Sequence, residues 1–256
     1  MTSLQKRFIE TIAENEWDVF SKEMILSDGR FTPDQIKEVL RYMLNNSELV
    51  QIEKGKYRRM SFSDEKVIGC FLVKDGGIAY WSALNMHGLT EQFPNKMFIQ
   101  TSQWKVDKII SGAEYKFVQV KKSKITGYQT LGLGNHQYRI TDIEKTIVDC
   151  FDLPEYSGGY FELIRAFYKV DLDAGKLVKY CNAVNNISVT KRIGYLGELF
   201  EKRKFSKFTN YARKRLNQTY TLLDGYGLNE GEFNKRWQLR LNIPENSLIE
   251  ISQSIY

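Results

Sequence analysis

Histidine and cysteine are scarce in this sequence, and their scarcity limits its chemistry. The 256 residues include two histidines, His87 and His136, so their number excludes a histidine-rich metal site, although a carboxylate site stays open. There are three cysteines, Cys70, Cys150 and Cys181, and they are odd in number and widely spaced. This pattern is typical of reduced core cysteines in a cytosolic protein and argues against disulfides or a zinc site.

Long apolar runs and nucleotide-binding motifs are missing as well. No run of about 18 apolar residues occurs, so we expect no membrane span. The first twenty residues carry six charged side chains, which is unlike a signal peptide, and we expect a cytoplasmic protein. There is no phosphate-binding loop and no dinucleotide-binding glycine motif. Asp171 and Asp173 form a D-x-D pair, but the Gly-Ser dipeptide of nucleotidyltransferases is absent, so this pair predicts a helix N-terminus.

Residues 32–59 predict one helix followed directly by a hairpin. Thr32 is a good N-cap, Pro33 fits the first helical position and Gln35 completes a capping box. Apolar residues then recur at three- and four-residue spacing as far as position 44, and strands are expected at 49–52 and 56–60. A first helix at 4–15, a short strand near 17–20 and a short helix at 22–26 precede them. This order is typical of a winged helix-turn-helix, and a generic helix-hairpin in an α+β domain is the alternative.

The polar stretch 61–64 predicts a domain boundary, which gives domains 1–61 and 62–256. The fold class we expect is α+β: an N-terminal winged helix-turn-helix, then a larger mixed α/β domain with a small sheet and several C-terminal helices. Strands are expected at 97–101, 115–120, 128–140 and 237–243. Helices are expected at 65–73, 80–87, 141–151, 160–169, 174–184, 189–202 and 208–217.

The net charge of +6 lies entirely in the last part of the chain. Residues 1–60 carry ten Lys and Arg against ten Asp and Glu, and residues 61–160 carry eleven against eleven. Residues 161–256 carry sixteen against ten. The expected DNA-binding domain is therefore not strongly basic, which weakens a DNA-binding interpretation because phosphate neutralisation supplies most non-specific affinity.

Two stretches of the second domain could carry catalytic residues, and both have a structural explanation that we favour. Ser82 and His87 lack a partner in the sequence, so we expect close helix packing there. Glu144 fits a capping box that begins at Thr141. Asp149 follows Lys145 by four residues, which predicts an ion pair on a helix surface.

A basic tract follows in the C-terminal helices. Gly194 and Gly197, one turn apart, predict the close approach of another element. The tract is either a solvated surface or a surface that binds a partner or nucleic acid, and the sequence leaves both open. Its cations are Lys191, Arg192, Lys202, Arg203, Lys204, Lys207, Arg213, Lys214 and Arg215.

Four segments together resemble the AbiEi-type antitoxins, the transcriptional regulators of type IV toxin-antitoxin systems linked to phage abortive infection. They are LVQIEKGKYRR (49–59), SALNMHGLTEQFP (82–94), ITDIEKTIVD (140–149) and IGYLGELF (193–200). The resemblance covers roughly residues 4–242, and the order and spacing of the segments carry it.

The resemblance implies a repressor that binds inverted repeats in its own promoter and counters a neighbouring nucleotidyltransferase toxin. The family is not known for a catalytic activity of its own, and we expect no cofactor. Asp34 and Glu38 on the third helix put direct reading of the major groove in doubt. Two other classes stay open: a metal-dependent enzyme acting on nucleic acid or nucleotides through Glu144, Asp149 and Asp171, and a winged-helix scaffold that binds protein. The DNA contacts implied by position are Gln35, Lys37, Arg41, Lys54, Lys56, Arg58 and Arg59.

Overall fold

The N-terminal unit of the computed structural model, which describes residues 2–253, combines three helices with a three-stranded sheet. In chain order its elements are α1 (Ser3–Glu14), β1 (Val19–Ser21), α2 (Lys22–Asp28), α3 (Pro33–Asn45), β2 (Leu49–Glu53) and β3 (Lys56–Arg59). The strands pair antiparallel in the order β1-β3-β2. Each helix begins at a residue whose side chain accepts a backbone N–H, namely Thr2, Ser21 and Thr32. The helices and the hairpin lie close to where the sequence predicts them.

This small sheet is covered on both faces. Successive side chains of a strand point to opposite sides. Phe20 and Tyr57 accordingly join the core formed with α1 and α3, whereas Val19 and Ile52 join the core of the following segment. The N-terminal unit is therefore packed against the rest of the chain through one face of its sheet.

A six-stranded sheet forms the middle of the molecule. Its strands are β4 (Gly77–Ile78), β5 (Met97–Thr101), β6 (Lys108–Ile110), β7 (Ala113–Gln119), β8 (Tyr128–Leu131) and β9 (Tyr138–Thr141). They are ordered β6-β7-β5-β4-β9-β8, with β5–β7 and β4–β9 parallel and the other pairs antiparallel. Helices α4 (Glu65–Phe71) and α5 (Tyr80–Met86) pack against this sheet.

The C-terminal part is mainly helical and contains the largest hydrophobic cluster. Gly194 and Gly197 do permit close approach, as predicted, because a Cβ at either position would overlap the ring of Trp237 or of Phe205. The elements are α6 (Ile143–Asp152), α7 (Tyr160–Lys169), α8 (Ala174–Val184), α9 (Ile187–Leu199), α10 (Ser206–Arg215), β10 (Thr221–Leu222), β11 (Glu232–Asn234), β12 (Leu239–Leu241) and α11 (Glu245–Gln253).

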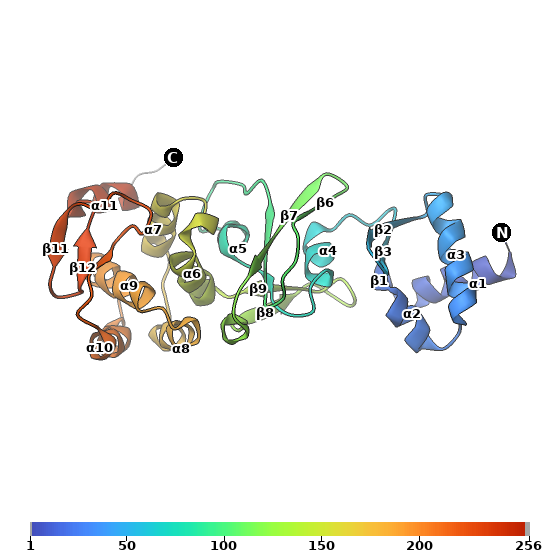
Figure 1. Ribbon diagram of the computed structural model, residues 1–256, viewed down its shortest axis with the longest axis horizontal. Coiled ribbons are helices and arrows are strands. Elements are labelled where there is room, and N and C mark those ends of the chain that lie inside the picture. The colour runs from blue at the N-terminus through green and yellow to red at the C-terminus, as the bar shows by residue number, and fades with distance from the viewer. Residues whose placement is uncertain (1, 254–256) are drawn as a thin grey trace.

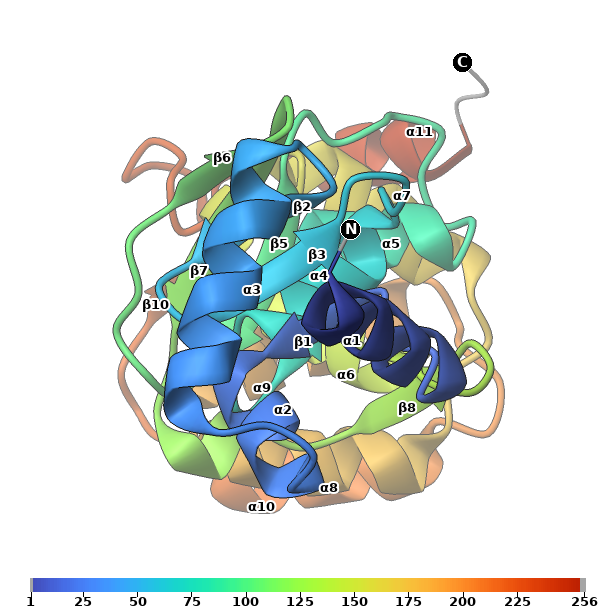
Figure 2. The same cartoon turned by 90° about the vertical axis from the view of Figure 1, so that its right-hand side faces the viewer.

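The three parts follow one another along the long axis of the molecule (Figure 1). Helix α3 lies near one end and α10 near the other. Seen from the N-terminal end, α1 and α3 lie nearest the viewer and the strands lie behind them (Figure 2). Within residues 2–253 no helix has the length and apolar character needed to cross a bilayer.

The α+β class that the sequence predicts is confirmed, but several short elements were not foreseen. Strands β4, β6, β10 and β11 have two or three residues each, too few to show an alternating pattern. Helix α11 was also missed, and the last predicted strand, 237–243, shortens to Leu239–Leu241.

Candidate nucleic-acid interface

Helix α3 presents a free basic pair at the end of the molecule. Its apolar residues, among them Ile36 and Met43, are buried, which turns the opposite face outward. Lys37 and Arg41 lie one turn apart on that face, and both are exposed. Neither forms an ion pair with any residue of the described chain. These two predicted DNA contacts are thus available to a polyanion.

The capping role predicted for Gln35 is confirmed, and it restricts what else this side chain can do. Gln35 Oε1 accepts a hydrogen bond from Thr32 N at 3.1 Å, and Thr32 Oγ1 accepts one from Gln35 N at 3.3 Å. The same oxygen lies 3.5 Å from a guanidinium nitrogen of Arg7. The amide oxygen of Gln35 is therefore engaged within the protein.

Lys56 and Arg58 were predicted to be phosphate contacts on the hairpin, and the structure places both in internal contacts instead. Lys56 Nζ donates to the carbonyl oxygens of Phe71 and Leu72, at 3.1 and 3.0 Å. Arg58 is 5% exposed, and its guanidinium donates to three backbone carbonyls and, at 2.6 Å, to Ser111 Oγ. The physical reason is that this face of the sheet packs on the middle of the molecule, which the sequence of a hairpin does not reveal.

Glu53 connects the hairpin to the middle segment electrostatically. Its carboxylate pairs with Lys105 at 2.5 Å, Lys108 at 2.9 Å and Lys56 at 3.2 Å. Burial by itself would raise the pKa of Glu53, but hydrogen bonds from the three ammonium groups lower that pKa to about 2. Burial also lowers the pKa of Lys56, against the effect of Glu53.

The remaining hairpin cations, Lys54 and Arg59, stay closer to solvent. Lys54 is exposed at the tip of the turn between β2 and β3. The Arg59 side chain is 41% exposed and pairs with Asp18 at 3.2 Å. Of the predicted hairpin contacts, Lys54 is the most accessible.

Three of the nine cations in the C-terminal basic tract are engaged in hydrogen bonds within the protein, and two of them are buried. Lys191 is fully buried, and its ammonium group donates to Asn217 Oδ1 at 2.7 Å and to the backbone carbonyl of Thr219. Arg192 is 8% exposed and donates to backbone carbonyls. Lys202 donates to the carbonyls of α7 and the residue that follows it, and burial lowers its pKa to about 8. The prediction of a surface role was wrong for Lys191 and Arg192, because residues 217–222 cover the polar side of α9.

The other six cations of the tract are exposed and lie on α10 or on the segment before it. We call them the α10 basic surface; its members are Arg203, Lys204, Lys207, Arg213, Lys214 and Arg215. Because α10 and α3 lie near opposite ends of the molecule (Figure 1), the two basic regions do not form one continuous surface.

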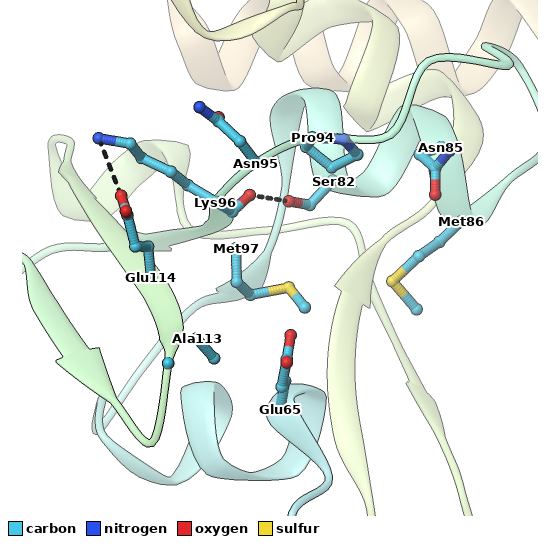
Figure 3. Close-up of a pocket in the computed structure, with 11 residues that line it drawn as sticks. Glu65, Ser82, Asn85, Met86, Pro94, Asn95, Lys96, Met97, Ala113 and Glu114 are labelled. Atoms are coloured by element: carbon cyan, nitrogen blue, oxygen red, sulfur yellow. Dashed lines mark hydrogen bonds and ion pairs between the residues drawn. The ribbon is translucent and has the colours of Figure 1, made fainter.

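Ser82 has a structural role in a small cavity beside β5. Its hydroxyl accepts a hydrogen bond from Phe98 N at 2.9 Å and donates to the carbonyl of Lys96 at 3.1 Å. Figure 3 shows this contact, with the Lys96 side chain directed away toward Glu114, its ion-pair partner at 3.2 Å. The cavity has a volume of about 220 Å³. Within the described residues His87 forms no hydrogen bond with Ser82. Its Nε2 lies 2.7 Å from the carbonyl oxygen of Thr141. The packing interpretation of both residues is supported.

The carboxylates of α6 are also engaged internally, although not as predicted. The N-cap is Asp142, not Thr141, and Glu144 does not close a capping box. Glu144 instead accepts from Asp173 N at 3.0 Å and from Lys176 Nζ at 3.2 Å. Asp173 caps α8, which confirms the helix N-terminus predicted there.

Asp149 does pair with Lys145, but the pair is buried and not on the helix surface. Their side chains are 1% and 0% exposed. Burial raises the pKa of Asp149, although Lys145 acts in the opposite direction. The second carboxylate oxygen accepts from Gln100 Nε2 at 3.1 Å, which links α6 to β5. Across residues 2–253 no three His, Cys, Asp or Glu side chains come together as a set of metal ligands.

Contacts between the N-terminal unit and the β8–β9 hairpin were not foreseen. His136 Nε2 lies 2.8 Å from Asp18 Oδ2, and the His136 ring stacks on Phe62 at a centroid distance of 5.1 Å. Asn135 Nδ2 donates to the carbonyl of Asn15. These residues are far apart in the sequence and follow no motif, so no sequence signal could have identified them.

No family model matches this chain, and no curated protein matches it. A solved structure, that of the RV2827C protein from Mycobacterium tuberculosis, superimposes with a TM-score of 0.66 at 16% sequence identity. The match covers 98% of this chain and 96% of that one. The likeness extends to the whole chain and shows a shared fold.

Proposed function

We propose that residues 1–61 form a winged helix-turn-helix domain that binds DNA, with α3 as its recognition helix. The observation that carries this proposal is the pair Lys37 and Arg41, which are exposed one turn apart near the end of the molecule and form no ion pair with residues 2–253. A helix placed in the major groove reads bases and phosphates with such outward side chains. The order of helices and the following hairpin supports the same assignment.

The roles of the seven predicted contacts are revised in this proposal. Lys37 and Arg41 contact DNA directly, and Lys54 and Arg59 reach neighbouring phosphates. Lys56 and Arg58 act indirectly, because they hold the hairpin against the middle of the molecule. Gln35 maintains the start of α3.

For the whole chain we propose a cytoplasmic, non-catalytic antitoxin without a cofactor, which represses its own toxin-antitoxin promoter and counters a nucleotidyltransferase toxin encoded beside it. The resemblance of four segments to AbiEi-type antitoxins supports this proposal. The α10 basic surface is our candidate for the antitoxin role. It would meet an acidic toxin surface or compete for the nucleic acid that the toxin uses.

The proposed DNA binding is tested by gel-shift titration of the full chain with DNA from upstream of its gene. Arg41→Ala should weaken binding by about 1–3 kcal/mol and blur sequence preference if Arg41 reads a base. Lys37→Ala should weaken all sequences alike and lower the salt slope by about one unit if Lys37 contacts a phosphate. Lys235→Ala, an exposed cation in the C-terminal part, is the matched control and should bind like wild type.

Promoter repression and protection from the toxin can be tested separately in the same full-length protein. A Lys37→Ala/Arg41→Ala double variant should lose repression of a promoter reporter and still restore growth when co-expressed with the neighbouring toxin. Unchanged DNA affinity in this double variant would refute the recognition-helix assignment. Loss of protection in a folded double variant would refute the assignment of DNA binding to one end of the molecule and of toxin protection to the other.

A further inference from the structure

Arg7 of α1 lies beside the first turn of α3. Its guanidinium carbon lies 4.9 Å from the centroid of the Phe31 ring, and one guanidinium nitrogen lies 3.5 Å from Gln35 Oε1. Helices α1 and α3 pack against each other at the N-terminal end of the molecule (Figure 2). Arg7 is exposed and forms no ion pair with any residue of the described chain, and Glu10, one turn further along α1, pairs with Lys6 at 3.9 Å. A second helix thus places an available cation alongside α3.

The Arg7 side chain is held in place without a carboxylate partner. A guanidinium is attracted to the face of an aromatic ring, so the contact with Phe31 fixes its position and leaves its charge uncompensated. Arg30, in the turn before α3, is different, because its guanidinium lies 2.6 Å from Glu14 and 2.8 Å from Asp28. The charge of Arg7 is therefore available to an external anion, whereas that of Arg30 is already balanced.

The exposed face of α3 has Gln35 at one flank and Lys37 at the other. Each residue advances an α-helix by about 100°, so these two side chains lie about 160° apart around the helix axis. The exposed acidic residues Asp34 and Glu38 lie between them. Because Arg7 contacts the Gln35 flank, the cations Arg7 and Lys37 lie on opposite sides of the exposed face, with the carboxylates in the middle.

This arrangement of charges matches the two sides of a DNA major groove. The groove is about 12 Å wide and an α-helix with its side chains is about 10–12 Å across, so a helix that lies in the groove has one phosphate backbone along each flank. We propose that Arg7 binds a phosphate of one DNA strand while Lys37 binds a phosphate of the other, so that the two cations hold α3 in the groove from both sides. This inference rests on the proposed DNA binding through α3. The carboxylates in the middle then face base edges, where they can accept from the amino group of cytosine.

The test uses the full chain and DNA from upstream of its gene, with gel-shift titration at several salt concentrations and phosphate-ethylation interference. Arg7→Gln should weaken binding about tenfold at low salt and lower the salt slope by about one unit, because one phosphate contact is lost. Arg7→Lys keeps the charge and should retain most of the slope. Arg30→Gln is the matched control and should bind with the wild-type slope, since its charge is balanced within the protein. The ethylated phosphate that no longer interferes in Arg7→Gln should lie on the strand opposite to the one lost in Lys37→Ala.

An unchanged salt slope in Arg7→Gln would overturn the proposal even if affinity falls, because Arg7 would then only support α3 through Phe31. Interference sites of Arg7 and Lys37 on the same strand would overturn it equally. If Arg7→Gln is unstable, Arg7→Met replaces it, since its unbranched side chain can still cover the Phe31 ring. Wild-type behaviour of Arg7→Gln together with loss of binding in Lys37→Ala/Arg41→Ala would refute this inference alone. Absence of binding by the wild-type chain would refute the proposed DNA binding as well.

Discussion

Glu53→Gln should destabilise the protein by breaking the link between the hairpin and the middle of the molecule. In the folded state the Glu53 carboxylate accepts from Lys56, Lys105 and Lys108, and its side chain is 23% exposed. The Lys105 side chain is 15% exposed, so its ammonium group would lose a partner where little water can replace it. The variant thus removes attraction and leaves three like charges close together.

The magnitude follows from the pKa of Glu53, which falls from 4.5 to about 2 on folding. One pKa unit corresponds to about 1.4 kcal/mol, so the full shift corresponds to roughly 3 kcal/mol. Solvent screening of a partly exposed group reduces this value, and we expect about 1–3 kcal/mol in the free energy of unfolding at neutral pH.

The sign of the pH dependence can be tested as well. Because folding lowers the pKa of Glu53, its stabilising contribution is complete above about pH 4.5 and disappears as the pH falls to about 2. The difference in unfolding free energy between wild type and Glu53→Gln should therefore shrink over this interval. Urea unfolding at several pH values, followed by circular dichroism, measures it.

Glu48→Gln is the matched control, because Glu48 is exposed next to the same hairpin. It should change the free energy of unfolding by less than about 0.5 kcal/mol. If Glu53→Gln is no more destabilising than Glu48→Gln, or if its effect is the same at every pH, the electrostatic argument is wrong.

Three further predictions concern the C-terminal part. Asp149→Asn should lower the free energy of unfolding by urea by about 3–5 kcal/mol, because it leaves the fully buried Lys145 ammonium without its counter-charge. A Lys145→Met/Asp149→Leu double variant should lose less stability than Asp149→Asn, and a larger loss in the double variant would contradict a buried ion pair. Gly194→Ala should lower stability by about 1–3 kcal/mol, since its Cβ would lie 2.1 Å from an indole ring carbon that must move; an unchanged melting temperature would show that the packing is looser. Reversing Arg213 and Arg215 to Glu should abolish protection from the neighbouring toxin in a growth assay and leave promoter repression intact; loss of repression alone would assign the α10 basic surface to DNA.

The local sequence determined the start and the buried face of α3. A capping box requires residues three positions apart, and an amphipathic helix repeats its apolar residues every three to four positions. Both signals lie within a dozen residues, so Thr32, Gln35 and the outward Lys37 and Arg41 could be placed correctly. The close approach at Gly194 and Gly197 was foreseeable for the same reason, although not the rings that make it.

Tertiary structure decided which polar side chains remain available. Periodicity identifies the apolar face of an element, but it does not tell what covers the opposite face. Lys191 and Arg192 lie off the apolar face of α9 and are nevertheless buried, because the chain after α10 returns over them and offers carbonyl oxygens. Lys56 is engaged in the same way by the carbonyls at the end of α4, and Arg58 is engaged by Ser111 in addition to the carbonyls of Arg59, Met60 and Phe62. A charged side chain that finds such acceptors can be buried, and only the three-dimensional arrangement brings those acceptors within hydrogen-bond distance.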